Sequence, residues 1–183
     1  MVLLESSVVL KTGQKAPDFE LMGVDGRAHS RAEYESKDGL LVVFMCNHCP
    51  YVQAKTDALN EIYRIYGDRI GMVGINSNDA ESYPEDSYDN MKRMAAEKGY
   101  GFDYLVDETQ ETAKSYGAMC TPDPFLFDSK HRLVFHGRLD DGHGPEGRVT
   151  TKTMLENIKT MLDGGNIQKD FDPSVGCSIK WKT

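Results

Sequence analysis

A CxxC segment follows directly on a run of six apolar residues, and this order constrains the fold more than any other feature of the chain. The run spans residues 40–45, and the segment is Cys46-Asn47-His48-Cys49-Pro50. A continuous apolar run is typical of a strand buried on both faces. Residues 51–66 then carry apolar side chains at near-helical spacing, and Gly67 is a suitable helix end. The sequence therefore predicts that a central strand delivers two thiols to the first turn of a helix.

This predicted position of the thiols favours redox chemistry. A helix N-terminus carries partial positive charge and unpaired N–H groups. Both stabilise thiolate, which is the form of cysteine that attacks disulfides and peroxides. We expect Cys46 to be the more exposed nucleophile, and Cys49, one turn later and more buried, to resolve the mixed disulfide and close a ring with Cys46.

Composition and charge exclude several classes of partner. The 183 residues fit one domain, with 39% hydrophobic and 27% charged residues and a formal net charge of −8. This acidic balance argues against nucleic acid or an anionic membrane as the main partner. Apolar runs stay far below the roughly 20 residues that span a bilayer. The first residues lack the basic region of a signal peptide, so we expect a cytoplasmic location.

The remaining pattern predicts a mixed sheet. Early alternation of strands and helices implies parallel strand pairs, and the short turn at residues 128–131 implies an antiparallel pair. We expect a lead-in over residues 1–12, one domain over residues 13–165 and an irregular tail over residues 166–183. The acidic stretch Glu81–Asp89 is interpreted as a solvated face. The expected elements are a hairpin within residues 16–27, strands at 69–76, 125–128 and 132–138, and helices at 84–98, 109–116 and 151–162.

Three segments occur in a characteristic order: Ala16-Pro17-Asp18-Phe19, then residues 44–49, then Thr121-Pro122 ahead of the strand at residues 125–128. Together they resemble the thioredoxin-fold redoxin family, and more closely its peroxiredoxin-like branch of the alkyl hydroperoxide reductase/thiol-specific antioxidant type. The resemblance covers residues 13–163. It implies an α/β, thioredoxin-like fold: a central mixed β-sheet flanked by helices on both faces, with an N-terminal β-hairpin extension and an irregular C-terminal tail.

The resemblance also implies roles for individual residues. Thr121 and Pro122 match the segment whose cis-proline faces the dithiol. A histidine before the second cysteine is similar to the CxHC centre of oxidising disulfide enzymes, so His48 is expected to stabilise a thiolate; the alternative is a solvent-facing histidine without a role. Asn47 suits the turn from loop to helix. Cys120 is a candidate resolving thiol, with a small buried filler as the alternative.

Two further residues are candidate site residues because they have a weaker resemblance to residues of peroxiredoxin sites. Cys177 is similar to the C-terminal resolving cysteine of some peroxiredoxins, although docking of the tail by Trp181 accounts equally well for its segment. Arg138 is a candidate for the arginine with which peroxiredoxin sites stabilise thiolate, and a surface ion pair with Asp140 is the alternative.

The chain departs from peroxiredoxins at one position that matters for function. Those enzymes place threonine three residues before the peroxidatic cysteine, whereas Cys46 stands there and Cys49 matches the peroxidatic residue. We therefore expect a thiol-disulfide oxidoreductase. The alternative is a thiol-dependent peroxidase in which Cys49 attacks peroxide and Cys46 or another thiol condenses with the sulfenic acid.

A third interpretation is a non-catalytic module of the same fold that uses the dithiol to bind zinc or does not use it at all. Zinc would require the cysteines at positions 46, 49, 120 and 177; the wide spacing of the last two disfavours such a site, and no metal is expected. No organic cofactor is required, because sulfur carries the electrons. The expected partners are a disulfide-containing protein or a small-molecule thiol or peroxide, and an electron donor of thioredoxin or glutathione type.

Overall fold

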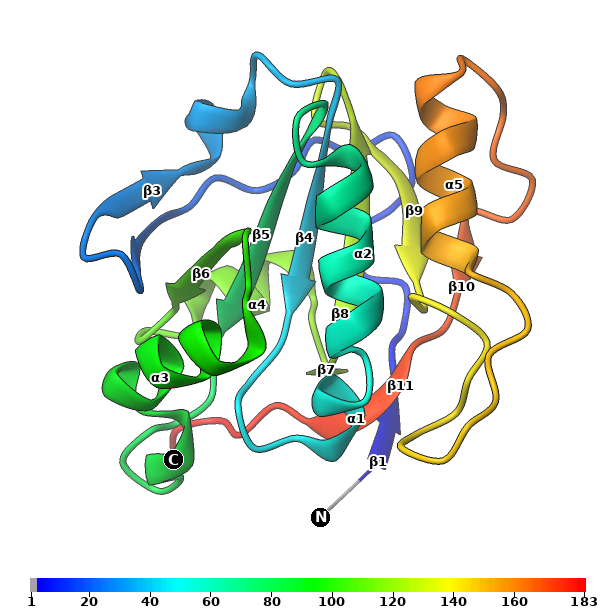
Figure 1. Cartoon of the computed structure of the whole chain (residues 1–183). Helices are drawn as coiled ribbons and strands as arrows, with labels where there is room; N and C mark the ends of the chain where they lie inside the picture. The colour runs from blue at the N-terminus through cyan, green and yellow to red at the C-terminus, as the bar shows by residue number, and fades with distance from the viewer. Residues whose placement is uncertain (1–2) are drawn as a thin grey trace.

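The computed structural model describes residues 3–183, and most of its strands form one central sheet. Within that range the sheet is eight-stranded, in the order β10-β9-β8-β4-β5-β6-β2-β3 (Figure 1). The first two residues of the predicted lead-in lie outside the described range. The strands of this sheet are β2 (Glu20–Gly23), β3 (Ala28–Ser30), β4 (Gly39–Phe44), β5 (Ile70–Asn76), β6 (Asp103–Val106), β8 (Asp123–Asp128), β9 (Leu133–Gly137) and β10 (Phe171–Asp172).

The strand pairing confirms a mixed sheet. β4, β5 and β6 are parallel neighbours, whereas β8 runs antiparallel to both β4 and β9. β2 pairs antiparallel with β3 and with β6, so a hairpin extends the sheet at its edge, with its second strand beyond the predicted range of 16–27. β6 was not among the expected elements, and it separates the hairpin from β5.

A smaller sheet of three strands lies at one end of the central sheet, in the order β1-β11-β7. These strands are β1 (Leu3–Glu5), β7 (Cys120–Thr121) and β11 (Val175–Ser178). The prediction of an irregular tail is therefore wrong for β10 and β11. The strand conformation of β11 depends on backbone partners near the N-terminus and around residue 120, which local sequence pattern does not reveal.

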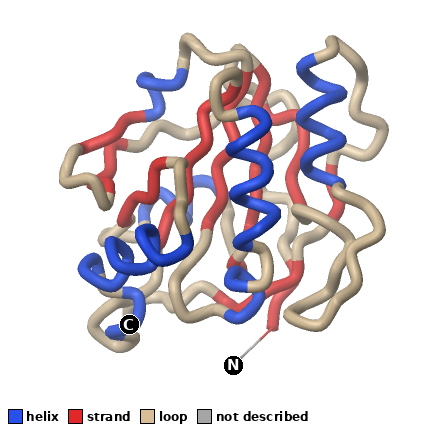
Figure 2. The backbone as a smooth tube through the Cα atoms, viewed as in Figure 1, coloured by secondary structure: helices blue, strands red, loops and turns tan. Residues whose placement is uncertain are grey.

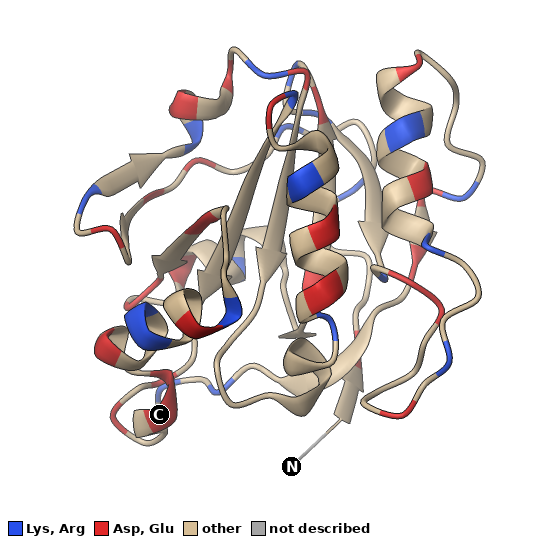
Figure 3. Cartoon of the chain, viewed as in Figure 1, with Lys and Arg blue, Asp and Glu red and all other residues tan. Residues whose placement is uncertain are grey.

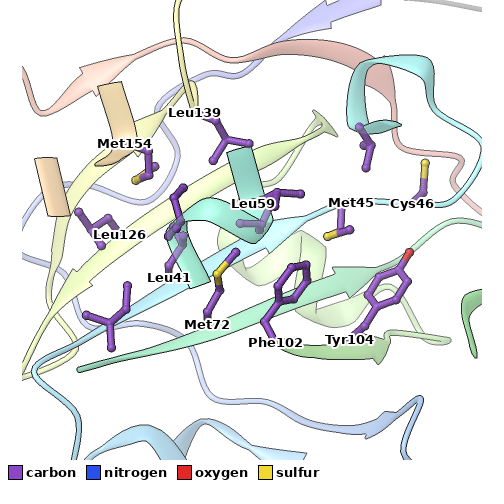
Figure 4. Close-up of a cluster of buried hydrophobic side chains, with 14 of the residues drawn as sticks. Leu41, Met45, Cys46, Leu59, Met72, Phe102, Tyr104, Leu126, Leu139 and Met154 are labelled. Atoms are coloured by element: carbon purple, nitrogen blue, oxygen red, sulfur yellow. The ribbon is translucent and has the colours of Figure 1, made fainter. Parts of the chain in front are cut away.

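Helices cover both faces of the central sheet, as predicted (Figures 1 and 2). Alternate side chains of β4 enter two separate cores: Leu41 and Val43 pack with α2, α3 and α5, while Leu40 and Val42 pack with α4 on the other face. Figure 4 shows the first core, with Cys46 at its end. The helices are α1 (Pro50–Gln53), α2 (Thr56–Tyr66), α3 (Tyr88–Lys98), α4 (Glu111–Tyr116) and α5 (Thr153–Leu162), with 3-10 turns η1 (Arg31–Tyr34) and η2 (Pro84–Asp86). Among these helices, none has both the length and the apolar character needed to cross a membrane.

The helix predicted after the CxxC segment is interrupted. Lys55 leaves helical geometry, with φ −103° and ψ 5°, and separates the single turn of α1 from α2. Its buried ammonium group binds Asp140 and the carbonyl oxygen of Gly142, where 2.8 Å separates Nζ from that oxygen. The helix predicted from Pro84 is likewise divided, because Ser87 is extended between η2 and α3.

Candidate functional site

The two cysteines of the CxxC segment lie where β4 leaves the central sheet. The chain passes from Phe44 through Met45 into a short loop, and Cys49 caps α1, with Pro50 as the first helical residue. Proline suits this position because the first turn of a helix leaves its N–H groups unpaired. α1 lies beside β11, and neither the loop nor β11 carries a charged side chain (Figure 3).

Cys49 forms a disulfide with Cys177, 128 residues further along the chain, with 6.3 Å between the two Cα atoms. Cys46 and Cys120 are free thiols, and all four cysteines are buried. The structure thus pairs Cys49 with the tail rather than with Cys46, which differs from the ring predicted within the CxxC segment. Cys177, a candidate resolving thiol, is the cysteine that the fold brings to the site.

Backbone pairing in the smaller sheet holds Cys177 in place. β11 is antiparallel to β7, with Cys177 opposite Thr121, and β1 pairs with the other edge of β11. Gly176 makes this close approach possible, because a Cβ atom there would lie 2.0 Å from the carbonyl oxygen of Thr121. The Ser174 hydroxyl also donates to the carbonyl oxygen of Pro122 at 2.7 Å. The tail is therefore an integral part of the site.

The peptide bond between Thr121 and Pro122 is cis, as predicted, and Thr121 touches both sulfurs of the CxxC segment. Its Oγ1 lies 3.6 Å from the Sγ of Cys46, and its carbonyl oxygen lies 3.3 Å from the Sγ of Cys49. The N–H of Cys49 also donates to the Sγ of Cys46. The free thiol and the disulfide therefore share one small, buried environment.

Cys46 is more exposed than Cys49 only by 2% against 0%, and the expectation that it ionises readily is wrong for this state of the molecule. The residue is 2% exposed, and burial, reinforced by the negative charge of Asp86, raises the pKa of its thiol to about 12. The hydroxyl of Thr121 and the N–H of Cys49 oppose this rise without offsetting it. The physical reason is that loss of solvent around this buried thiol outweighs its hydrogen bonds to Thr121 and to Cys49, the N-cap residue of α1.

Asp86 from η2 is the residue that organises the loop. One of its oxygens accepts the N–H of Asn47 at 2.8 Å and that of His48 at 3.3 Å. The other lies 2.6 Å from Nδ1 of His48 and accepts the side-chain amide of Asn78 at 2.7 Å. Asp86 is 1% exposed, so the interpretation of its acidic stretch as a solvated face is wrong for this residue, whereas Glu81, Glu85 and Asp89 are exposed. A run of acidic residues carries no local signal that one of them will turn inward.

Asn47 and His48 occupy different environments. The side chain of Asn47 is buried: its amide donates to the carbonyl oxygen of Glu85, and its oxygen accepts the hydroxyl of Tyr104, both at 2.9 Å. The side chain of His48 is 22% exposed and stacks on the ring of Tyr83. His48 is thus the part of the CxxC loop that connects the buried sulfurs with solvent.

Cys120 and Arg138 lie at the periphery of this arrangement. Burial and the charge of Asp123 raise the pKa of the Cys120 thiol, whose contacts are the carbonyl oxygens of Pro122 and Ser174 at 3.7 and 3.8 Å. Arg138 pairs with Asp172 at 3.1 Å rather than with Asp140, which binds Lys55. These contacts are consistent with structural roles for Cys120 and Arg138.

Two clusters bring metal-ligating atoms together among the described residues. Donor atoms of Cys46, His48 and Asp86 lie within 4.8 Å of one another, as do donor atoms of the Asp25, His29 and Asp103 side chains. In the first cluster the Asp86 oxygens already accept four N–H groups, so hydrogen bonding explains the proximity. The four-cysteine zinc site does not assemble, because two of its thiols form the disulfide.

Comparison with known proteins places this geometry in a family. The chain is similar to the thiol-disulfide oxidoreductase ResA of Geobacillus thermodenitrificans, with 26% identity over 82% of the chain and 76% of that protein. An uncharacterised conserved protein from Geobacillus kaustophilus is 42% identical and superposes with a TM-score of 0.93, covering 100% of this chain and 97% of that one. The thioredoxin domain of a thiol-disulfide oxidoreductase from Bacteroides vulgatus shares the fold, with a TM-score of 0.66 at 16% identity over 84% and 99% of the two chains. The AhpC/TSA family model matches residues 12–136, so the chain belongs to the AhpC/TSA family and has its thioredoxin-like fold.

Proposed function

We propose that this protein is a thiol-disulfide oxidoreductase in which Cys49 exchanges disulfide partners. The observation that carries the proposal is the Cys49–Cys177 disulfide packed against the cis peptide of Thr121, with the free thiol of Cys46 against the same residue. Membership of the AhpC/TSA family and the similarity to a protein named thiol-disulfide oxidoreductase support it.

The exchange is an internal displacement that needs no outside oxidant or reductant. The thiolate of Cys46 attacks the Sγ of Cys49, a new Cys46–Cys49 bond forms, and the Cys49–Cys177 bond breaks. Cys177 leaves with the electron pair and takes up the proton that Cys46 has lost, so the number of thiols and disulfides is unchanged. This step converts the tail disulfide into the CxxC disulfide.

We expect redox partners to react with the CxxC disulfide. Cys177 is enclosed between β1 and β7, whereas Cys46 adjoins the partly exposed His48. A donor dithiol attacks the CxxC disulfide, forms a mixed disulfide and leaves as a disulfide itself, transferring two electrons. In the reverse direction the reduced pair reduces a disulfide of a protein or a small molecule. A donor of thioredoxin or glutathione type and a cytoplasmic location stay predictions.

A thiol peroxidase is the second candidate, and the tail disulfide is the observation that favours it. In that reaction the thiolate of Cys49 attacks a hydroperoxide, giving a sulfenic acid and an alcohol or water. The thiol of Cys177 then condenses with the sulfenic acid, releasing water and forming the observed disulfide. Cys46 is not required for either step.

The variants Cys46→Ser, Cys49→Ser and Cys177→Ser distinguish the two candidate functions. Each variant is assayed for insulin reduction and for hydrogen peroxide consumption, with dithiothreitol as the electron donor. The oxidoreductase requires Cys46 and Cys49, so either substitution abolishes insulin reduction, while Cys177→Ser retains turnover through the CxxC pair. The peroxidase requires Cys49 and is slowed by Cys177→Ser, but it survives Cys46→Ser. Insulin reduction that persists in Cys46→Ser contradicts the first proposal.

A further inference from the structure

The chain's own C-terminal tail occupies the edge of β7 that lies beside Cys49 (Figure 1). β11 runs antiparallel to β7, with Cys177 opposite Thr121. Just before β11, the hydroxyl of Ser174 donates to the carbonyl oxygen of Pro122 at 2.7 Å. An extended polypeptide binds a sheet by adding its main chain to an exposed edge. This edge of β7 is therefore closed to the main chain of a partner.

Contacts that involve no sulfur atom hold the beginning of this segment. We call residues 174–182 the tail strap. The N–H of Ser174 donates to Oγ of Ser6 at 2.8 Å, and its carbonyl oxygen accepts the N–H of Ser6 at 2.9 Å. β1 then pairs along the outer edge of β11, with Leu4 opposite Gly176. These contacts do not depend on the disulfide bond.

The end of the tail strap is anchored by two other segments, the loop after β5 and the residue that precedes α4. The N–H of Lys180 donates to Oδ1 of Asn78 at 2.9 Å. Its carbonyl oxygen accepts the N–H of Asp79 and Nε2 of Gln110, each at 2.8 Å. The N–H of Lys182 donates to Oε1 of Gln110 at 2.9 Å. The side chain of Gln110 therefore binds the strap at two positions.

Between these two anchors, Ile179 fixes the tail strap to the body of the domain. Its side chain is 3% exposed and packs in the same core as Leu40 and Val42. Its N–H donates to the carbonyl oxygen of Met119 at 3.1 Å. Departure of the strap would expose this apolar side chain to water, which is unfavourable. The strap therefore has reason to stay docked when Cys177 is not bonded to Cys49.

The cysteines of the site present very little area to solvent. Cys46, Cys49 and Cys177 are 2%, 0% and 1% exposed, whereas the side chain of His48 is 22% exposed. A small disulfide needs room only for its own few atoms. A polypeptide disulfide brings a main chain on each side of its sulfur atoms, and with the strap in place that main chain has no edge of β7 to join.

We propose that the tail strap stays on β7 in both disulfide states and restricts the site to low-molecular-weight disulfides and thiols, which reach the CxxC pair beside His48. This inference rests on the proposed function, because it names the substrate class of the same site, and the covalent steps remain those of that function. A polypeptide disulfide reacts only with the fraction of molecules whose strap has left, and its apparent affinity falls by that fraction. Of the two expected donor types, the strap favours glutathione over thioredoxin.

The test compares the reaction of one polypeptide disulfide with that of one small disulfide. Reduced full-length protein, freed of dithiothreitol, is mixed with insulin or with 2-hydroxyethyl disulfide, and the rate at which the CxxC thiols are lost is measured. The double variant Gln110→Gly/Ile179→Ala loosens the strap, because it removes the side-chain hydrogen bonds of Gln110 and the buried anchor. Glycine also suits the left-handed backbone at position 110, where φ is 63°. We expect the insulin rate to rise about tenfold or more and the rate with 2-hydroxyethyl disulfide to stay within about twofold.

The same two substitutions made outside the strap provide the matched control. Ile167→Ala/Gln168→Gly changes a partly buried and an exposed residue of the preceding tail, and we expect it to leave both rates unchanged. Because every protein is reduced at the start, a bond between Cys49 and Cys177 does not account for a slow reaction with insulin. An insulin rate that does not rise in the strap variant overturns the proposal, as does a rise that is equal for both disulfides.

Hydrogen exchange of the unmodified protein covers the case in which the strap variant fails to fold. The amide N–H groups of Ser174, Ile179 and Lys180 are expected to exchange at least about a hundredfold more slowly than in an unfolded chain, in the oxidised and in the reduced protein. Loss of this protection on reduction overturns the proposal, because the disulfide alone would then hold the strap. Failure of the proposed function is recognised separately: neither disulfide oxidises the CxxC pair, although the amide protection persists.

Discussion

Replacing Cys177 with serine should lower the free energy of unfolding by about 3–5 kcal/mol under oxidising conditions. The disulfide closes a loop with a sequence separation of 128 residues, and the chain-entropy relation gives about 5 kcal/mol at 25 °C for a loop of that length. Measured disulfides usually contribute less, typically about 2–4 kcal/mol, so the calculated value is an upper bound. Serine is nearly isosteric with cysteine and preserves the backbone pairing of β11 with β1 and β7.

Equilibrium unfolding in guanidinium chloride provides the assay, with wild-type and Cys177→Ser protein measured with and without dithiothreitol. The oxidised wild type should unfold at the highest denaturant concentration. Reduction should remove that advantage from the wild type and change the variant much less, because a Cys46–Cys49 link closes only a very short loop. Cys46→Ser is the matched control, since it removes a buried thiol of the same site and keeps the disulfide. An oxidised wild type within about 1 kcal/mol of its reduced form would refute the reasoning, because the covalent link would then contribute almost nothing.

Three further predictions concern neighbouring groups. Gly176→Ala should destabilise the oxidised protein by about 1–3 kcal/mol and slow disulfide formation, because the added Cβ lies 2.0 Å from the carbonyl oxygen of Thr121; unchanged thermal unfolding contradicts this. The rate at which iodoacetamide alkylates Cys46 in the oxidised protein should rise about tenfold per pH unit up to about pH 12, because the raised pKa keeps the reactive thiolate scarce below that pH. A rate that reaches a plateau below pH 9 would contradict this prediction. The Cys120→Ala variant should keep both the Cys49–Cys177 disulfide and insulin reduction, because the buried thiol of Cys120 contacts only carbonyl oxygens among its hydrogen-bond partners. Loss of insulin reduction in a folded Cys120→Ala variant would contradict a purely structural role for Cys120.

Local sequence pattern is sufficient to predict the strand that leads to the dithiol. The apolar run of β4 is buried at every position, as expected for a strand covered on both faces. The cis peptide before Pro122 and its contact with both sulfurs also follow from the family resemblance. These features depend on residues close together in the sequence or on motifs that occur in a fixed order.

The partner of Cys49 and the surroundings of Cys46 were not predictable in the same way. Cys177 reaches the site through β11, whose strand partners come from residues near the N-terminus and from β7. The burial of Asp86 depends on donors from two separate loops. Both features result from contacts between segments that are distant in the sequence, and hydrophobic periodicity reports only on local structure.

Disulfide mapping of the oxidised protein tests the central claim, that Cys49 is the sulfur shared between two partners. The protein is alkylated under denaturing conditions at low pH and digested, and the linked peptides are identified by mass spectrometry. We predict that the wild type shows Cys49 linked to Cys177 with a free thiol at Cys46, and that Cys177→Ser shows Cys49 linked to Cys46 instead. A wild type with four free thiols after mild oxidation, or a Cys177→Ser variant that forms no disulfide at Cys49, contradicts the account.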